Sequence, residues 1–257
     1  MFRCLNFAVI FAGSLIIIVT LTFLSSRGLA APAKVTSASS RAAHARAGAS
    51  PAVSTNYTTV MCLKQQGSLV GAESIYISSD AIRIDNPARS VVTVAHAPVW
   101  EVATYNPTAK KYCVNPLDKY HGQMTHIFLF YGIDMSVYDF VEDHKTQFLN
   151  HQAISMKAVP NKKDTENKSV TAALKLFIVA DTPSIPQKAA DVLTRHLCLP
   201  ITHKLPLRMD YMTDKLTQKA IDTVSWEKQA VDKNWFDVPN GYIHCKKESN
   251  VCMEENF

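Results

Sequence analysis

The pattern of hydrophobic and polar residues divides the 257-residue chain into three parts. Residues 7–24 contain no charged side chain and lie between Arg3 and Arg27. As a helix rising about 1.5 Å per residue, this run would be roughly 27 Å long, which is short for a membrane span and long for the core of a cleaved signal peptide. We therefore expect residues 1–30 to export the chain, either as a signal peptide or as a signal anchor.

Residues 31–56 have a different composition. Nearly all of them are Ala, Ser, Thr, Pro, Val, Gly or a basic residue, and none is aromatic or acidic. Such a segment buries too little apolar surface to offset the entropy of the chain. We expect it to be a disordered basic linker.

From residue 57 onward the hydrophobic pattern has a period of two, which predicts a sheet. Short runs rich in Val, Ile, Thr and Tyr alternate with turn residues. The predicted strands are 57–63, 73–78, 81–85, 90–95, 99–105, 110–114, 153–159, 169–180, 207–212 and 219–231. Because the first six are joined by connections too short for parallel crossovers, they predict an antiparallel meander.

Two segments have the period of a helix instead. The first covers residues 134–150, with an apolar face formed by Ile133, Val137, Phe140, Val141 and Phe148. The second begins at residues 181–184 and is ended by Pro200, with an apolar face formed by Ile185, Ala189, Val192, Leu193 and Leu197. Residues 57–257 are therefore predicted to form a single α+β domain that is mainly β.

The net charge of +5 lies entirely outside this domain. It is carried by Arg3, Arg27, Lys34, Arg41 and Arg46, and from residue 57 onward acidic and basic residues cancel. A neutral domain behind a basic linker argues against nucleic-acid binding. The linker would either lie near an anionic lipid surface or simply be a solubilising spacer.

The cysteines allow disulfides to be predicted for an oxidising compartment, although their number in the exported part is odd. Five cysteines, Cys62, Cys113, Cys198, Cys245 and Cys252, follow the export segment. We expect Cys245 to pair with Cys252 and Cys62 with Cys113, which leaves Cys198 as a buried free thiol.

Motifs of enzymes are almost absent from the sequence. There is no G-x-S-x-G, no phosphate-binding glycine loop and no H-E-x-x-H. Ser225 and Lys228 match the S-x-x-K spacing, but they lie in a strand-like segment. No spacing of Cys and His is typical of a zinc site. We expect a protein that is not an enzyme and holds no metal or cofactor.

Aromatic residues are the remaining candidates for a binding site. Phe128, Phe130 and Tyr131 precede the first predicted helix, Phe140 lies on it, and Trp235 lies near the C-terminus. These side chains would either line an apolar cavity or fill the core between sheet and helices.

Several short segments together suggest a family. They are the strand around Arg83, the pair Val99-Trp100, the turn Tyr105-Asn106-Pro107 and the closing segment 236–242. These segments resemble the LolA-like superfamily of periplasmic carriers and sensors that handle lipoproteins or lipids. The resemblance implies an incomplete antiparallel β-barrel, or half-barrel, with two or three helices on its concave face and an apolar cavity between the sheet and the helices. Trp100 and Arg83 are further candidates for residues of this cavity. The resemblance also implies that Arg83 holds the helices shut, whereas the alternative is a solvated arginine on a strand.

The sequence thus predicts an exported, non-enzymatic binding protein that shelters a lipid or an acyl chain in an apolar cavity. A lipidated protein is a further expected partner. The alternative is a membrane-tethered extracytoplasmic sensor or scaffold domain that binds a partner protein. In either case we expect the domain on the periplasmic or extracellular face, free or anchored to the cytoplasmic membrane through residues 1–30.

Overall fold

The computed structural model describes residues 56–68, 71–122, 138–160, 173–199, 204–213 and 216–252. The predicted export segment and nearly all of the predicted linker lie outside these residues. Residues 53–257 form a compact unit of their own. Within the described ranges, no helix combines the length and the apolar character that crossing a membrane requires.

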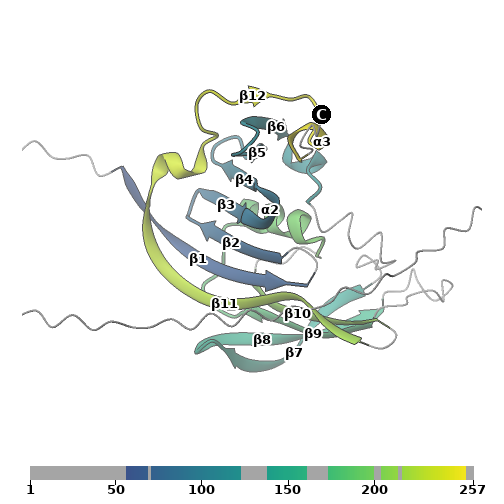
Figure 1. The fold of residues 1–257 in the computed structure, drawn as a ribbon. Coiled ribbons are helices and arrows are strands. Elements are labelled where there is room, and N and C mark those ends of the chain that lie inside the picture. The colour runs from purple at the N-terminus through teal and green to yellow at the C-terminus, as the bar shows by residue number, and fades with distance from the viewer. Residues whose placement is uncertain are drawn as a thin grey trace, which may run out of the picture. The chain divides into compact units, whose positions relative to one another are not determined.

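One open sheet of twelve strands dominates the domain, in the order β12-β6-β5-β4-β3-β2-β1-β11-β10-β9-β8-β7 (Figure 1). The strands are β1 (Tyr57–Gly67), β2 (Gly71–Ile77), β3 (Ala81–Asn86), β4 (Val91–His96), β5 (Val102–Asn106), β6 (Lys111–Asn115), β7 (Tyr138–Phe148), β8 (His151–Pro160), β9 (Ala173–Ala180), β10 (Pro206–Thr213), β11 (Leu216–Asp232) and β12 (Ile243–His244). The pairing of β1 with β11 joins two antiparallel meanders, and β12 lies parallel to β6. The predicted α+β, mainly β half-barrel is confirmed.

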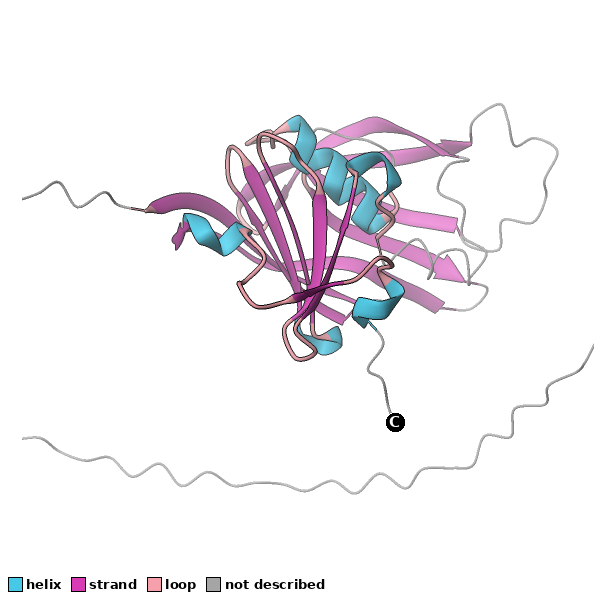
Figure 2. Ribbon diagram, turned by 90° about the horizontal axis from the view of Figure 1, so that it is seen from above, coloured by secondary structure: helices cyan, strands magenta, loops and turns pink. Residues whose placement is uncertain are grey.

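Helices are few in the described part of the chain. They are α2 (Gln187–Leu197), α3 (Ser249–Cys252) and three short 3-10 turns, η1 (Pro87–Arg89), η2 (Leu117–Lys119) and η5 (Lys233–Phe236). Figure 2 shows α2 packed across the strands of the sheet. Glu248, just before α3, accepts a hydrogen bond from Thr104, which shares a face of β5 with the core residue Val102. Both α-helices therefore cover the same face, the concave one.

The predicted helix at 134–150 is wrong, because residues 138–148 form strand β7. β7 lies at the edge of the sheet, and its residues 141–145 are all exposed. A bulge between Glu142 and His144 interrupts its pairing with β8. An edge strand with so much solvent exposure lacks the regular alternation that identifies a half-buried strand. The spacing of Phe140, Val141 and Phe148 imitates a helical face only by coincidence.

The opposite, convex face of the first meander is also covered. Residues 233–242 return across it, where Phe236 packs with Val60 and Ala81, and Val238 and Tyr242 pack against strands β4 and β5. Strands β3 and β4 are therefore buried on both faces. This explains why residues 91–95 read as a nearly continuous apolar run and do not alternate.

Neither expected disulfide is formed in this structure, in which Cys62, Cys113 and Cys245 are free thiols. Cys62 lies in β1 and Cys113 in β6, with four strands between them. Five strand spacings of about 4.8 Å place them roughly 24 Å apart along the sheet, whereas a disulfide requires Cα atoms within about 7 Å. The expected Cys62–Cys113 pair is therefore wrong. Cys198, which was expected to be buried, is only partly buried.

Candidate functional site

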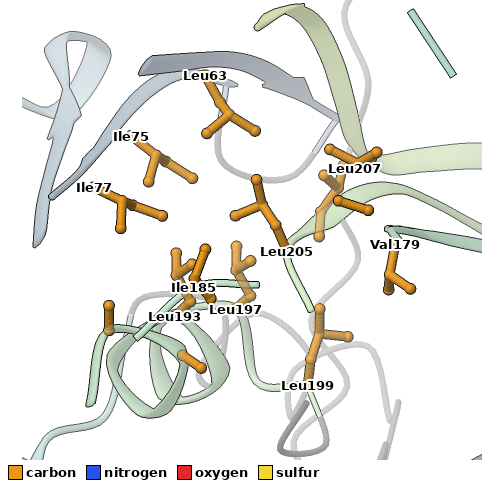
Figure 3. Close-up of a cluster of buried hydrophobic side chains, with 14 of the residues drawn as sticks. Leu63, Ile75, Ile77, Val179, Ile185, Leu193, Leu197, Leu199, Leu205 and Leu207 are labelled. Atoms are coloured by element: carbon orange, nitrogen blue, oxygen red, sulfur yellow. The ribbon is translucent and has the colours of Figure 1, made fainter. Parts of the chain in front are cut away.

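The candidate site is the contact between α2 and the concave face of the sheet, which we call the inner interface. Figure 3 shows apolar side chains of α2 and its flanks pointing toward strands β1 and β2 on one side and β10 on the other. The helix and its flanks contribute Ile185, Leu193, Leu197 and Leu199, and the sheet side contributes Leu63, Ile75, Ile77, Val179, Leu205 and Leu207. All of these side chains are buried. A ligand that bound on the concave face would meet this apolar surface.

The inner interface is closed in this structure. A cavity of about 10 Å³ remains beside α2, lined by Phe177, Ile185, Ala190, Leu193, Thr194, Leu199, Lys204 and Pro206. That volume is about enough for one water molecule. The apolar side chains of α2 fill the space that a bound acyl chain would need, so a ligand could enter only if α2 moved.

A buried polar group fastens the C-terminal end of α2 to the sheet. The Nδ1 atom of His196 lies 2.9 Å from the Tyr120 hydroxyl, and its Nε2 atom lies 3.3 Å from Oε1 of Glu73. The Asn86 amide donates a second hydrogen bond to Glu73 at 3.0 Å. Each ring nitrogen of His196 therefore faces an oxygen atom, one of Tyr120 and one of Glu73.

The backbone completes this attachment at Gly122. Its N–H donates to the Arg195 carbonyl at 3.1 Å, and a Cβ atom at this position would overlap the backbone of His196. Only glycine allows so close an approach. We call Glu73, Asn86, Tyr120, Gly122 and His196 together the α2 clasp.

The surroundings of Glu73 in the clasp shift the pKa of its carboxyl group. Burial raises the pKa of Glu73 and is the largest single effect, but the attraction and hydrogen bond of His196, the hydrogen bond of Asn86 and the attraction of Arg89 together outweigh it. The net effect is a pKa below the ordinary carboxyl range. Glu73 is therefore stabilised as a buried carboxylate by its partners in the clasp.

Arg83 does not belong to the inner interface, which corrects its predicted role. It lies between Ile82 and Ile84 in β3, whose side chains belong to the core on the concave side, so Arg83 points to the convex face. The predicted contact with a helical plug is therefore wrong. The alternative of a solvated arginine is wrong as well, since Arg83 is only 9% exposed.

Arg83 instead anchors the C-terminal segment. It donates to Asp85 at 2.7 Å, to the Tyr105 hydroxyl at 2.8 Å and to the Trp235 carbonyl at 2.8 Å. Its guanidinium also lies 4.1 Å from the centre of the Trp235 ring. Burial raises the pKa of Asp85, and Arg83 only partly offsets that effect. Arg83 and Trp235 are thus brought together, but as a structural anchor outside the predicted cavity.

Of the other residues predicted to line the cavity, two lie in the described part of the chain. Trp100 and Phe140 are partly buried and pack against the main core. The Phe140 ring lies 5.1 Å from that of Phe177, which lines the small cavity beside α2. The predicted Phe128, Phe130 and Tyr131 lie outside the described residues.

The clasp residues were missed, although the sequence holds a signal for two of them. Glu73 shares the period-two face of β2 with Ile75 and Ile77, so alternation places a carboxylate in the core. His196 follows Val192 at helical spacing and falls on the apolar face of α2. A charged and a titratable residue on two faces that must meet predict a buried pair.

Comparison with known proteins gives distant likenesses among solved structures. One is an uncharacterized conserved protein from Thermus thermophilus, with 11% sequence identity and a TM-score of 0.32 over 76% of this chain and 94% of that one. Another is a putative outer membrane lipoprotein-sorting protein domain from Vibrio parahaemolyticus, with 10% identity and a TM-score of 0.27 over 70% of this chain and 88% of that one. No family model and no curated protein matches the sequence. TM-scores this low carry no argument, so membership of the LolA-like superfamily stays a prediction.

The lowered pKa of Glu73 predicts a specific pH dependence of stability. A carboxyl group whose pKa is lower in the folded state stabilises the fold above its unfolded value, here 4.5, and this contribution is lost as pH falls through the folded value. We expect the unfolding free energy of the wild type to fall more steeply below pH 4.5 than that of Glu73→Gln, measured by urea unfolding from pH 6 down to about pH 3. Glu227→Gln, at an exposed position, should keep the wild-type slope. Equal slopes for Glu73→Gln and the wild type would contradict the clasp.

Replacing Arg83 tests the convex-face anchor. Arg83→Met keeps the apolar stem but leaves the largely buried Asp85 unpaired, so we expect the unfolding free energy to fall by about 3–5 kcal/mol. Lys228→Met on exposed β11 should change it by less than about 0.5 kcal/mol. Urea unfolding at pH 7 measures both. If the unfolding free energy of Arg83→Met falls by no more than that of Lys228→Met, Arg83 does not anchor the C-terminal segment.

Proposed function

We propose that this is an exported, non-enzymatic binding protein that shelters an acyl chain or a lipid at the inner interface. The ligand replaces α2 on the concave face after the helix moves away. One observation carries the proposal: the amphipathic helix α2 covers the apolar concave face of β1, β2 and β10, and its polar attachment to the sheet is concentrated in the clasp at its C-terminal end.

The energetics of exchange support this proposal. Burial of an acyl chain with about twelve CH₂ groups would contribute roughly 10 kcal/mol. Displacing α2 uncovers the four large apolar side chains that the helix and its flanks contribute to the inner interface, at about 1.5–3 kcal/mol each, or roughly 6–12 kcal/mol in total. The free energy gained by burying the acyl chain is therefore similar to the free energy lost when α2 leaves the sheet. A ligand could thus displace the helix without unfolding the sheet.

A catalytic role for the clasp has less support. Tyr120, His196 and Glu73 form a hydroxyl–imidazole–carboxylate chain of the kind found in hydrolases. However, Tyr120 is 1% exposed and the other two residues are 3% exposed. Their polar atoms contact one another and Asn86, so the group suits holding a helix better than meeting a substrate.

Binding of a fluorescent fatty-acyl probe to residues 53–257 tests the proposal. We expect saturable binding at micromolar protein that unlabelled fatty acid displaces. His196→Gln weakens the closed state, so it should bind the probe about 5-fold more tightly or better, because apparent affinity depends on the population of the open form. His244→Gln, exposed on β12, is the matched control and should bind as the wild type does.

Two results would sink this proposal. One is a lack of saturable binding by both the wild type and His196→Gln. The other is equal affinity of His196→Gln, His244→Gln and the wild type, since binding would then be independent of the α2 clasp.

The second candidate is a membrane-tethered domain that binds a partner protein, and the position of β7 favours it. β7 is an exposed strand of 11 residues at one edge of the sheet. Edge strands offer backbone groups to which a partner can add a strand. This candidate requires the N-terminal segment to remain in the mature protein.

Mass spectrometry of the native N-terminus separates the two candidates. A mature protein that begins near Gly28 or Ala31 favours a free carrier, because the small residues there suit a signal peptidase. A mature protein that retains residues 7–24 favours the tethered domain. The second outcome, combined with an absence of acyl binding, would replace the carrier proposal with the tethered one.

A further inference from the structure

The C-terminal segment returns along the edge strand β6 in a fixed register. Strand β12 pairs in parallel with β6, with Ile243 opposite Lys111 and His244 opposite Tyr112. Beyond β12, the Cys245 N–H donates to the Tyr112 carbonyl at 2.7 Å. In a parallel ladder, the N–H of a residue donates to the carbonyl of the residue that precedes its partner on the neighbouring strand. The bond to the Tyr112 carbonyl therefore places Cys245 opposite Cys113.

This arrangement satisfies the geometric requirement of a disulfide. Neighbouring strands lie about 4.8 Å apart, and residues opposite each other in a parallel pair project their side chains to the same face. A disulfide needs Cα atoms roughly 4.4–6.8 Å apart. Cys113 and Cys245 can therefore be joined by side-chain rotation, with both strands left in place.

The surroundings of the two thiols differ. Cys113 is 2% exposed, whereas Cys245 is partly exposed. Burial raises the pKa of the Cys113 thiol, and the nearby Glu248 and Cys245 raise it further. The effect of Cys245 agrees with the register in placing the two sulfur atoms near each other. Cys245 is the thiol that an external reagent would reach first.

We infer that Cys113 and Cys245 form a disulfide when the protein enters an oxidising compartment. The oxidant is a disulfide, such as oxidised glutathione or an oxidised thiol–disulfide oxidoreductase. The Cys245 thiolate attacks the oxidant, forming a mixed disulfide and expelling one thiolate. The Cys113 thiolate then attacks the Cys245 sulfur and expels the second thiolate. Two electrons and the two cysteine protons end on the two thiols that are released.

The bond would fasten the C-terminal segment to the edge of the sheet. It closes a loop that contains α2, the second meander and the segment 233–242 on the convex face. Closing so long a loop restricts the unfolded chain and therefore stabilises the fold. This inference is independent of acyl binding, because it requires only an oxidising thiol buffer.

The competing pair is Cys245 with Cys252, which lies seven residues further along. Trypsin distinguishes the two pairings, because Cys113 lies in peptide 112–119, Cys245 in 234–246 and Cys252 in 248–257. We propose to equilibrate the full-length chain in mild detergent with a glutathione redox buffer, alkylate the free thiols and map the peptides without reduction.

The expected result is a cross-link between peptides 112–119 and 234–246, which is lost in Cys245→Ser and kept in Cys252→Ser and Cys62→Ser. Recovery of peptide 234–246 with an alkylated thiol, or joined to 248–257, would overturn the inference. Thermal unfolding gives a second readout: oxidation should raise the Tm of the wild type by about 5–10 °C and leave that of Cys245→Ser unchanged. Equal shifts in the two proteins would also overturn it.

Discussion

The structure depends on the burial of one apolar surface by one helix. An open sheet does not cover its own concave face, so the side chains of β1, β2 and β10 need a separate partner. Helix α2 provides that partner with an apolar face of matching chemistry. The clasp at its C-terminal end then sets where the helix lies, since His196 contacts both Glu73 and Tyr120.

The two faces of the first meander are covered by different physical means. On the concave side, apolar side chains form most of the contact between α2 and the sheet. The α2 clasp, a small buried polar group, fixes the position of the helix. On the convex side, Arg83 binds the returning segment through a hydrogen bond to the Trp235 carbonyl and stacking on the Trp235 ring, while Asp85 and Tyr105 of the sheet hold its guanidinium in place. The first covering does not depend on fixed donors and acceptors, because hydrophobic burial is not directional. The second depends on donors and acceptors in fixed places, so it suits a permanent attachment.

Local patterns predicted much of the fold, and non-local contacts explain what they missed. Period-two alternation located most of β1–β6 and β8–β11, and helical spacing located the buried face of α2. The prediction for residues 138–148, which form the edge strand β7, failed because solvent exposure removes the alternation of apolar and polar residues on which strand prediction rests. The prediction of the role of Arg83 failed for another reason: it depends on residues 233–242 returning across the sheet. The prediction of a Cys62–Cys113 pair failed because it depends on the order of the strands, which places four strands between β1 and β6. The sequence pattern places Glu73 on the apolar face of β2 and His196 on the apolar face of α2. That the two residues contact each other could not be predicted, because it depends on where α2 packs on the sheet.

The central claim is that an acyl chain and α2 compete for the same concave face. Hydrogen exchange measured by mass spectrometry, with and without saturating fatty acid, tests it most directly. The account predicts that the amides of Gln187–Leu197 exchange faster when fatty acid is bound, while those of β1 and β10 stay protected. Amides of α2 that exchange at the same rate or more slowly with fatty acid present would contradict it.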